Sequence, residues 1–574
     1  MDEKKLIQCK NKRLIAFYGK DMSKDKPWLK NYPEGTPDQL EFEPRTLVTL
    51  LDDAESEFSE VPAFTNFGVS ITTKEVEIKS KQFAAYLQKD LGLKKGDRIA
   101  LMMPNLLQYP VVIFGALRAG LIVVNVNPLY TSRELKHQLK DSGARVIMIF
   151  ENAAHVLDAV FSELEIEHVI VTKIGDFLGF PKGSLMNFAI KYLKKMVPAY
   201  KLPGAIKFND TLTRSIEDFE TVPVAVDDIA FLQYTSGTTG FSKGAMLSHG
   251  NVTKNLDQFH SMLDGILEEG QDIYMNALPI YHIYSLVVCV FAGYSQGCLN
   301  VLITNARDTS TLVAEMKKWP FSFFNGVSTL YESLLNHPEI GNVDFSSMKL
   351  SGAGGMATLR STAERWHELT GKVLLEGYGL SETSPGVTTS PAYAKTFSGN
   401  VGLPIPNTEI SIRDDDGNEV ESGQAGEICV RGPQVMQGYW RNEEATAEVI
   451  GEDGFFKTGD IGTMDEEGFL SITDRKKDMI IVSGFNVYPN EIEDVVCMHP
   501  DIIEAASIGV PDEKTGEAVK LFVVVGGDQK LTKEEIIDFC RKNLTAYKVP
   551  KQIEFMEELP KTTVGKILRR ELRE

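Results

Sequence analysis

The chain has 574 residues, a formal net charge of −20, 43% apolar residues and six cysteines. Its length exceeds what one hydrophobic core ordinarily covers, so we expect two or more domains. The acidic balance argues against non-specific nucleic-acid binding, while cysteines without a CxxC pair argue against a zinc site and indicate a reducing, cytoplasmic compartment.

Residues 1–27 carry several lysines and are expected to form an extension ahead of the first domain, with Met22 as an alternative start. No secretory signal is visible, and no run reaches the length of about 18 apolar residues that a membrane-crossing helix needs. Export and a transmembrane anchor are therefore not expected.

Apolar segments alternate with amphipathic ones from residue 93 to about residue 400. Residues 98–103, 121–126 and 145–150 predict strands, and residues 132–142 predict a helix. This alternation is typical of βαβ units around a largely parallel sheet. Shorter, turn-rich runs at 409–413 and 426–430 then predict a β-rich subdomain. The fold class expected is α/β.

Residues 184–197 (SLMNFAIKYLKKMV) predict a basic, amphipathic helix. Asn187, Lys191, Lys194 and Lys195 fall on one side of this helix, and most of its apolar side chains fall elsewhere. Such a helix can lie on an anionic membrane surface. A surface helix packed on its own domain would show the same pattern, so both interpretations stay open.

Residues 234–244 (YTSGTTGFSKG) form a loop rich in glycine and hydroxyl groups, between the apolar run 229–232 and a helix-like segment. Glycines let the backbone approach an anion, and amides, hydroxyls and Lys243 supply donors that wrap a phosphate. Gly244 follows the lysine, so this is not a Walker A motif. The loop predicts binding of the β- and γ-phosphates through Thr235, Ser236, Gly237, Thr238, Thr239, Gly240 and Lys243.

Residues 351–357 (SGAGGMA) contain the spacing G-x-G-x-x-A, and Glu376 lies 24 residues beyond Gly352. This pattern is a fair dinucleotide fingerprint, so a nicotinamide oxidoreductase is one interpretation. It leaves the loop at 234, Asp460 and Lys566 without a role. The preferred interpretation is that Gly352, Ala353 and Gly354 let an adenine approach the backbone.

The segment 377–383 follows a strand-like run at 373–375. Tyr378, between Gly377 and Gly379, offers a flat face on which adenine can stack, although ordinary core packing would also explain it. Glu382 and Thr383 stand just beyond. A lone glutamate is usually a solvated charge, so the role of Glu382 depends on its surroundings.

Lys566 stands in the segment 560–566 (PKTTVGK), where a glycine precedes the lysine. Where a carboxylate attacks a phosphate, two anions approach each other. A cation between them lowers the repulsion and stabilises the pentavalent charge. We therefore expect Lys566 to be catalytic. The neighbouring basic residues are expected to be solvated.

Five motifs in this order resemble the acyl-adenylate-forming superfamily, in particular its bacterial long-chain fatty acyl-CoA synthetases. They lie at 234–244, 378–382, 458–460, 474–478 and 560–566. The resemblance runs from Trp28 to the last residue and is densest at 468–493 (GFLSITDRKKDMIIVSGFNVYPNEIE). It implies an amino-terminal domain at 28–473, a hinge at Asp474 and a mobile α+β lid at 474–574, read as strand, helix, strand, strand, helix.

The resemblance also assigns roles residue by residue. It implies that Glu382 and Thr238 bind Mg²⁺, that Thr383 touches the α-phosphate, and that Asp460 and Arg475 hold the ribose. Gly484 would line the passage for the thiol of coenzyme A. His282, in the segment 279–284, would lie at the mouth of the acyl tunnel, although a satisfied core histidine is an equal alternative.

The expected function is an ATP-dependent, Mg²⁺-dependent ligase that joins long-chain fatty acids to CoA through acyl-AMP. A ligase for shorter or aryl acids is the main alternative. A peptide-synthetase adenylation domain, a luciferase-like oxidase and a non-catalytic binding module are weaker. The resemblance also implies a peripheral protein on the inner face of the membrane, and the amphipathic segment 184–197 is the candidate contact. A homodimer stays open.

Overall fold

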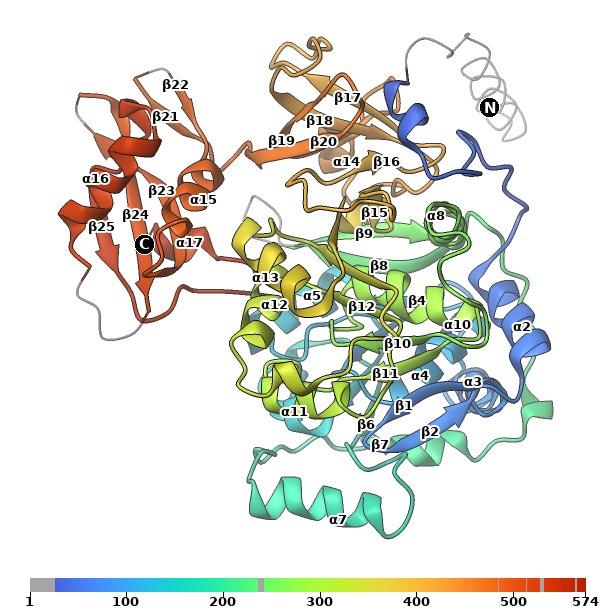
Figure 1. Cartoon of the computed structure of the whole chain (residues 1–574). Helices are drawn as coiled ribbons and strands as arrows, with labels where there is room; N and C mark the ends of the chain where they lie inside the picture. The colour runs from blue at the N-terminus through green and yellow to red at the C-terminus, as the bar shows by residue number, and fades with distance from the viewer. Residues whose placement is uncertain are drawn as a thin grey trace.

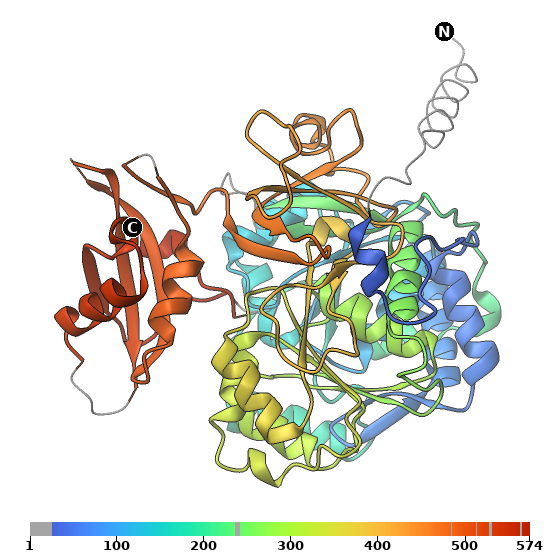
Figure 2. The same cartoon turned by 45° about the horizontal axis from the view of Figure 1, so that its top comes forward.

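The computed structural model describes residues 26–235, 242–483, 485–512, 514–526, 531–562 and 565–573. These residues form four β-sheets surrounded by helices. Figures 1 and 2 both show a large amino-terminal body, with the carboxyl-terminal unit standing to one side of it. The α/β class and the largely parallel sheets expected from the sequence are confirmed.

One sheet has seven strands in the order β7-β6-β5-β3-β4-β8-β9. All neighbouring pairs are parallel except β8 with β9. Its inner strands are buried along nearly their whole length, which is typical of a parallel sheet covered on both faces. The strands are β3 (Arg98–Met102), β4 (Ile122–Asn125), β5 (Val146–Phe150), β6 (His168–Thr172), β7 (Ile206–Lys207), β8 (Ile229–Thr235) and β9 (Lys243–Ser248).

The segment after the phosphate loop is a correction to the sequence prediction. A helix-like segment was expected there, but the chain first forms β9, which runs antiparallel to β8 with Thr235 opposite Lys243. Ala245 and Leu247 alternate inward along β9, and this period of two suits a strand. The helix α8 (His249–Met262) follows directly.

A second sheet has nine strands in the order β16-β15-β14-β13-β12-β10-β11-β1-β2. Its centre, from β14 to β1, is parallel. The strands are β1 (Pro62–Asn66), β2 (Val69–Thr72), β10 (Ile273–Asn276), β11 (Leu299–Leu302), β12 (Phe323–Gly326), β13 (Leu350–Gly354), β14 (Leu374–Gly379), β15 (Gly386–Thr389) and β16 (Leu403–Pro404).

A third, antiparallel sheet of four strands confirms the β-rich subdomain. Its strands are β17 (Glu409–Arg413), β18 (Gly426–Arg431), β19 (Phe456–Met464) and β20 (Leu470–Arg475). In Figure 1 this sheet leads directly into the carboxyl-terminal unit.

The carboxyl-terminal unit, which we call the lid, has its own mixed sheet and its own apolar core. Two strands precede its first helix, where the sequence predicted one. Its elements are β21 (Ile480–Val482), β22 (Phe485–Val487), α15 (Pro489–Cys497), β23 (Ile502–Asp512), β24 (Gly516–Val525), α16 (Lys533–Asn543), β25 (Gln552–Phe555) and α17 (Arg569–Leu572). The domain limits themselves, with a hinge at Asp474, stay a prediction.

The remaining helices cover the large sheets or connect their strands. The α-helices are α2 (Leu47–Phe58), α3 (Thr73–Lys89), α4 (Gln108–Arg118), α5 (Ser132–Ser142), α6 (Ala154–Asp158), α7 (Lys182–Phe188), α9 (Ile283–Ser285), α10 (Ala292–Ser295), α11 (Thr309–Met316), α12 (Ser328–Leu335), α13 (Arg360–Thr370) and α14 (Glu443–Val449). Turns of π-helix lie at Ala189–Leu193 and Leu286–Phe291. The 3₁₀ turns are Pro27–Asn31, Glu151–Ala153, Phe161–Glu163, Phe208–Leu212, Ile216–Asp218, Ile340–Asn342, Ser381–Thr383 and Ala546–Lys548.

The helix α4 is buried along its whole length, whereas α7 lies outside the body of the molecule. Every residue of α4 is buried, which is typical of a helix that is apolar on all sides. Figure 1 shows α7 projecting from the lower edge of the large domain. Among the described residues, no helix is both long and apolar enough to cross a membrane.

Candidate active site

The candidate site lies where strands of both large sheets end. Thr235 ends β8, Gly354 ends β13 and Gly379 ends β14. In open α/β sheets, ligands bind beyond the carboxyl ends of the strands. The third sheet supplies Asp460, and the lid supplies Lys566.

The two ends of the phosphate loop are held together by the pairing of β8 with β9. Thr235 lies opposite Lys243 in this pair, and the ammonium of Lys243 lies 5.1 Å from the ring centroid of Tyr439. Both residues thus occupy one edge of the site. Ser236, Gly237, Thr238, Thr239 and Gly240 lie outside the described residues, so their phosphate contacts stay a prediction.

Glu382 is a buried carboxylate with two hydroxyl donors. Tyr439 donates to its Oε1 at 2.9 Å, and Thr235 donates to the same oxygen at 3.4 Å. Burial raises the pKa of Glu382, and the hydrogen bonds from its own backbone and from Tyr439 oppose this shift. A buried carboxylate oxygen of this kind is a ligand that a hard cation prefers.

The residues present fit a Mg²⁺ ion that is shared with a phosphate. Within the described ranges, no group of three or more His, Cys, Asp or Glu side chains could hold a metal by itself. Mg²⁺ typically takes one or two carboxylates and completes its shell with phosphate oxygens and water. Glu382 next to the phosphate loop meets that requirement.

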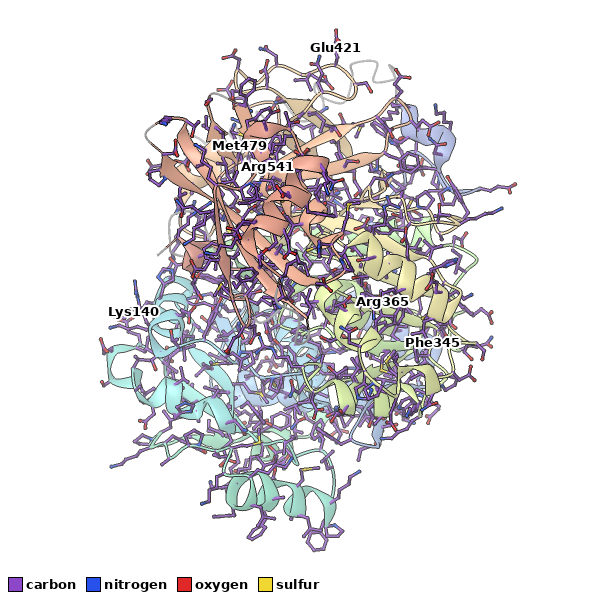
Figure 3. All side chains as sticks on the ribbon, turned by 60° about the vertical axis from the view of Figure 1, so that its left-hand side comes forward. Lys140, Phe345, Arg365, Glu421, Met479 and Arg541 are labelled. Atoms are coloured by element: carbon purple, nitrogen blue, oxygen red, sulfur yellow. The ribbon has the colours of Figure 1, made fainter. Side chains whose placement is uncertain are left out.

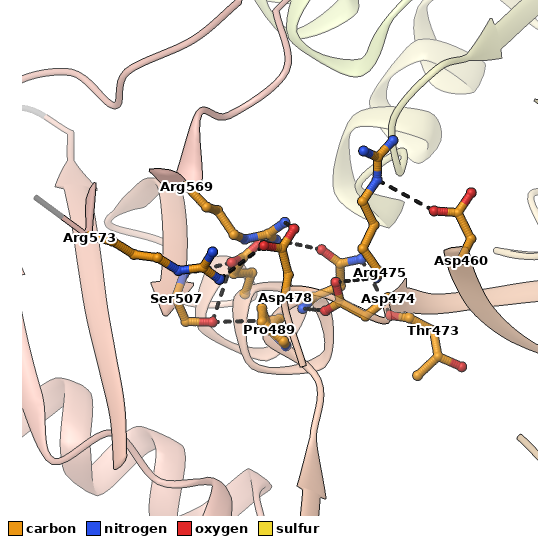
Figure 4. A network of polar contacts seen from close by, with 11 residues as sticks. Asp460, Thr473, Asp474, Arg475, Asp478, Pro489, Ser507, Arg569 and Arg573 are labelled. Carbon is orange, nitrogen blue, oxygen red and sulfur yellow. Dashed lines mark hydrogen bonds and ion pairs between the residues drawn. The ribbon is translucent and has the colours of Figure 1, made fainter. Parts of the chain in front are cut away.

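Tyr378 and Asp460 form a buried pair that Arg475, at the end of β20, extends. The Tyr378 hydroxyl donates to Oδ2 of Asp460 at 2.7 Å, and Nε of Arg475 lies 3.4 Å from Oδ1. Figure 4 shows the Arg475 guanidinium directed toward the carboxylate. The predicted nucleoside residues are thus brought together, with a Tyr378 ring on β14 and two acceptor oxygens on β19.

The glycines of the site make room for protein atoms. A Cβ on Gly352 would stand 2.7 Å from Oδ1 of Asn325, and one on Gly354 would stand 2.9 Å from the Tyr284 hydroxyl. A side chain on Gly379 would overlap the Pro385 carbonyl. A Cβ on Gly377 would lie 3.4 Å from the Thr388 carbonyl, and Ala353 is buried beside them on β13.

The geometry after β13 does not favour a dinucleotide-binding turn. In that turn, the glycines open a helix whose amino terminus receives the pyrophosphate. Here Gly352 and Gly354 lie within β13, and α13 begins only at Arg360. The structural requirement of the nicotinamide interpretation is therefore not met.

Lys566 enters the large domain from a short hairpin of the lid. The hairpin is closed by backbone bonds from Thr562 to Lys566 (2.7 Å) and from Leu568 to Pro560 (2.8 Å). Lys566 lines a small cavity of about 20 Å³ together with His282, Tyr284, Gly354 and other residues. Burial, followed by the charge of Arg475, lowers the pKa of Lys566 to about 8, while the charges of Asp460 and Glu382 oppose this shift.

His282 lies at the start of α9 and faces the same cavity. Its Nδ1 accepts a hydrogen bond from the Tyr284 amide at 3.3 Å. Burial, followed by the charge of Lys566, lowers the pKa of His282 to about 3, so its ring is neutral at pH 7. His282 therefore closes one wall of the cavity as a neutral group that also caps a helix.

Of two further predicted residues, the structure places Thr383 outside this arrangement and does not describe Gly484. The Thr383 hydroxyl donates to the Pro385 carbonyl at 2.5 Å, so in this structure it holds the turn after β14. Gly484 lies outside the described residues. The α-phosphate role of Thr383 and the CoA role of Gly484 stay predictions.

Two residues of the site, Tyr439 and Asn325, were not singled out from the sequence. Tyr439 binds Glu382 and lies under the Lys243 ammonium. The Tyr284 hydroxyl donates to Oδ1 of Asn325 at 2.6 Å and thereby fixes the space beside Gly352 and Gly354. No local signal marks these residues, because each acts through a partner more than 40 positions away.

A phosphate loop, a buried carboxylate suited to Mg²⁺, a nucleoside pair and a lysine delivered by a second unit define the class of ATP-dependent, adenylate-forming enzymes. The chain belongs to the AMP-binding enzyme family, whose profile matches residues 51–440. The profile of the AMP-binding enzyme C-terminal domain matches residues 491–566.

Named relatives extend this result over almost the whole chain. A long-chain-fatty-acid–CoA ligase from Salmonella typhimurium is 54% identical over 96% of this chain and 98% of its own length. The enzyme of the same name from Haemophilus influenzae is 49% identical with the same coverage. The ATP-bound structure of MatB from Rhodopseudomonas palustris has a TM-score of 0.79 at 29% identity, covering 92% of this chain and 98% of MatB.

These findings confirm the family and fold expected from the sequence. They also support ATP, Mg²⁺ and CoA, which AMP-forming ligases of this family use. The roles of individual residues, contact with a membrane and a homodimer stay predictions.

Proposed function

We propose that the chain is a long-chain fatty acid–CoA ligase that converts ATP to AMP and pyrophosphate. The observation that carries this proposal is the position of Lys566, which comes from the lid and shares a cavity with His282 and Gly354 of the large domain. The names of relatives at 49–54% identity support the long-chain substrate class. A ligase for shorter or aryl acids is the alternative.

In the first step, the fatty carboxylate attacks the α-phosphate of ATP, and pyrophosphate leaves. Lys243 and the phosphate loop bind the leaving group, while Tyr378 and Asp460 hold the nucleoside. A Mg²⁺ ion on Glu382 and Thr238 would offset charge on the phosphate oxygens. Lys566 stands between the two reacting anions and lowers their repulsion.

In the second step, the thiol of CoA attacks the acyl carbonyl, a thioester forms, and AMP leaves. The lid turns about Asp474, which withdraws Lys566 and brings the loop at Ser483 and Gly484 to the site. One lid with two working faces explains why the catalytic lysine follows the hinge in the chain.

The test of this activity is incubation with ATP, CoA and a ladder of acids from acetate and coumarate to long-chain fatty acids. We expect acyl-CoA, AMP and pyrophosphate in equal amounts, with turnover on long-chain acids. Good turnover on acetate or coumarate with none on long-chain acids would assign the alternative. A thioester formed without AMP would overturn the mechanism.

Replacement of Lys566 by Ala tests the catalytic assignment. We expect acyl-AMP formation to slow by about 10²–10³, or about 3–4 kcal/mol, because the lost cation acts mainly in the transition state. Lys561→Ala is the matched control, since Lys561 lies on the same hairpin but pairs with Glu504 inside the lid. Adenylation at the parent rate in Lys566→Ala would remove this role.

We also propose that the surface around α7 contacts lipid. Six large apolar side chains are exposed there, which we call the apolar tip: Phe180, Leu185, Phe188, Tyr192, Leu193 and Met196. Figure 3 shows side chains of this segment projecting from the lower end of the molecule. Lys194 and Lys195 are also exposed, which suits an anionic surface.

Vesicle binding tests the apolar tip. Burial of one large apolar side chain contributes about 1.5–3 kcal/mol, so partial burial of two gives roughly a tenfold change in affinity. We expect Phe188→Ser combined with Leu193→Ser to weaken sedimentation with phosphatidylglycerol-containing vesicles by that amount. Met498→Ser, which removes an apolar side chain that is 69% exposed on the lid, is the control. Equal binding by all three proteins would exclude this surface.

A further inference from the structure

A network of charged side chains lies between the hinge and the hairpin that carries Lys566. Its centre is Arg569, which is only 14% exposed and lies three residues after the catalytic lysine. Nη2 of Arg569 donates to Oδ1 of Asn490 at 2.7 Å and to Oε2 of Glu493 at 2.8 Å. Both partners belong to α15, so Arg569 attaches the end of the hairpin to this helix.

The helix α15 is in turn bonded to the hinge. The Asn490 amide nitrogen donates to Oδ2 of Asp474 at 2.8 Å, and its side chain donates to the Thr473 carbonyl at 3.3 Å. Asn490 therefore binds the hinge with its donors and Arg569 with its acceptor. Figure 4 shows Arg569 and Asp478 beside the hinge residues Thr473 and Asp474.

Two further contacts hold this network in place. Asp478, just after the hinge, lies 3.7 Å from Nη1 of Arg569 and 3.0 Å from Nη2 of Arg573. Glu493 accepts the Ser507 amide of β23 with its other oxygen, at 2.6 Å. Arg569 thus contacts two carboxylates, those of Asp478 and Glu493, and its loss would leave only Asp478 with an arginine partner in this network.

We propose that Arg569 is a positioning residue for the adenylation step: it fixes the Lys566 hairpin to the helix that is bonded to the hinge, so that closure of the lid delivers the ammonium to one defined place. Arg569 acts through Lys566 and α15 and does not touch the substrate. A network that lies within the lid and its hinge can turn with the lid, and it links the angle of the hinge to the position of the lysine. The inference rests on the proposed function in one respect, that Lys566 acts only in the first step.

The test separates the two half-reactions. Single-turnover acyl-AMP formation from ATP and a long-chain acid measures the first, and thioester formation from supplied acyl-AMP and CoA measures the second. For Arg569→Gln we expect adenylation to slow by about 10- to 100-fold, since misplacement by about 1 Å can have that effect. We expect the thioester step to stay within about twofold of the parent rate, because it does not use Lys566.

Two variants make the result specific to this side chain. Arg570→Gln removes an exposed neighbouring arginine and is expected to leave both half-reactions unchanged. Arg569→Lys keeps a positive charge near the carboxylates but has a single nitrogen in place of the guanidinium group. Its adenylation rate should therefore lie between those of the parent and of Arg569→Gln. Arg569→Lys also serves if Arg569→Gln does not fold.

Equal slowing of both half-reactions in Arg569→Lys and Arg569→Gln would show a structural role only and would overturn the proposal. Unchanged adenylation in both variants would also overturn it. Lys566→Ala, measured in the same assay, distinguishes a failure of the proposed function from a failure of this inference. A normal adenylation rate in Lys566→Ala contradicts the proposed function, whereas a slow Lys566→Ala with a normal Arg569→Gln contradicts this inference alone.

Discussion

Lys566 meets two opposing demands in the closed lid. It must be charged to bind a phosphate, yet burial lowers its pKa from 10.5 to about 8. Because closure of the lid lowers the pKa of Lys566, the ammonium loses its proton as the pH rises through about 8 instead of through 10.5. Before ATP binds, the neutral amine of Lys566 therefore predominates above about pH 8. The negative charge of the ATP phosphates then favours the protonated form.

A pH profile follows from this shift in the pKa of Lys566. At low ATP concentration, we expect the rate of acyl-AMP formation to fall as pH rises above about 8. Arginine stays charged through this range, so Lys566→Arg should lack the decline even if its rate is lower throughout. Single-turnover rates from pH 7 to 9.5 check this. The same decline in both proteins would assign it to another group.

At the scale of one element, the hairpin of Lys566 depends on Gly565. This glycine has a φ of +84°, which L-residues rarely adopt. A Cβ at this position would also overlap the Thr329 hydroxyl on α12 of the large domain. The backbone turn and the contact between the two units thus both require the absence of a side chain.

Gly565→Ala is expected to slow adenylation by about tenfold or more, because it combines backbone strain of about 1–3 kcal/mol with a steric clash on closure. Gly516→Ala is the control, since Gly516 is also in the lid with a φ of +77°, but its Cβ would meet the Ile481 carbonyl oxygen only at an ordinary contact distance of 3.9 Å. Thr329→Ala should partly restore the rate in Gly565→Ala. A loss of the same size in Gly516→Ala would mean that strain alone is responsible.

The elements that local signals determine were predictable from the sequence. The helix at 132–142 has the predicted bounds, because Thr131 and Glu134 form a capping box and Gly143 ends the helix in the left-handed region. The strand β9 was missed, because its six residues are too short for a clear period and follow a loop that itself resembles a strand-to-helix turn.

The residues of the candidate site also fall into two groups, those with a local sequence signal and those without one. Lys243 and Lys566 could be singled out from the sequence, since each stands in a glycine-containing segment with a physical use for its charge, and their roles stay predictions. Tyr439 could not be singled out, because it reaches Glu382 from 57 positions away, and Arg569 reaches Asn490 from 79 positions away. Such pairs depend on the packing of different elements, and a single sequence carries no local pattern for them.

At the scale of the whole molecule, the two units have separate apolar cores. One large-domain cluster spans residues 47–456 and another includes residues up to 472, whereas the lid clusters contain only residues 480–572. Separate cores allow separate unfolding. All four tryptophans, Trp28, Trp319, Trp366 and Trp440, lie in the large domain, so tryptophan fluorescence reports on that domain alone.

We expect calorimetry without ligand to resolve two transitions, only one of which coincides with the fluorescence change. Mg-ATP should raise the midpoint temperatures of both transitions, because Asp460 and Lys243 lie in the large domain and Lys566 lies in the lid. At a Mg-ATP concentration 100 times its dissociation constant, binding raises the free energy of unfolding by about 2.7 kcal/mol. In Lys566→Ala, the large-domain transition should still rise while the lid transition loses most of its shift, and Lys561→Ala should behave like the parent. A lid transition that rises equally in Lys566→Ala would show that the nucleotide couples the two units through other contacts, with Arg475 as the next candidate.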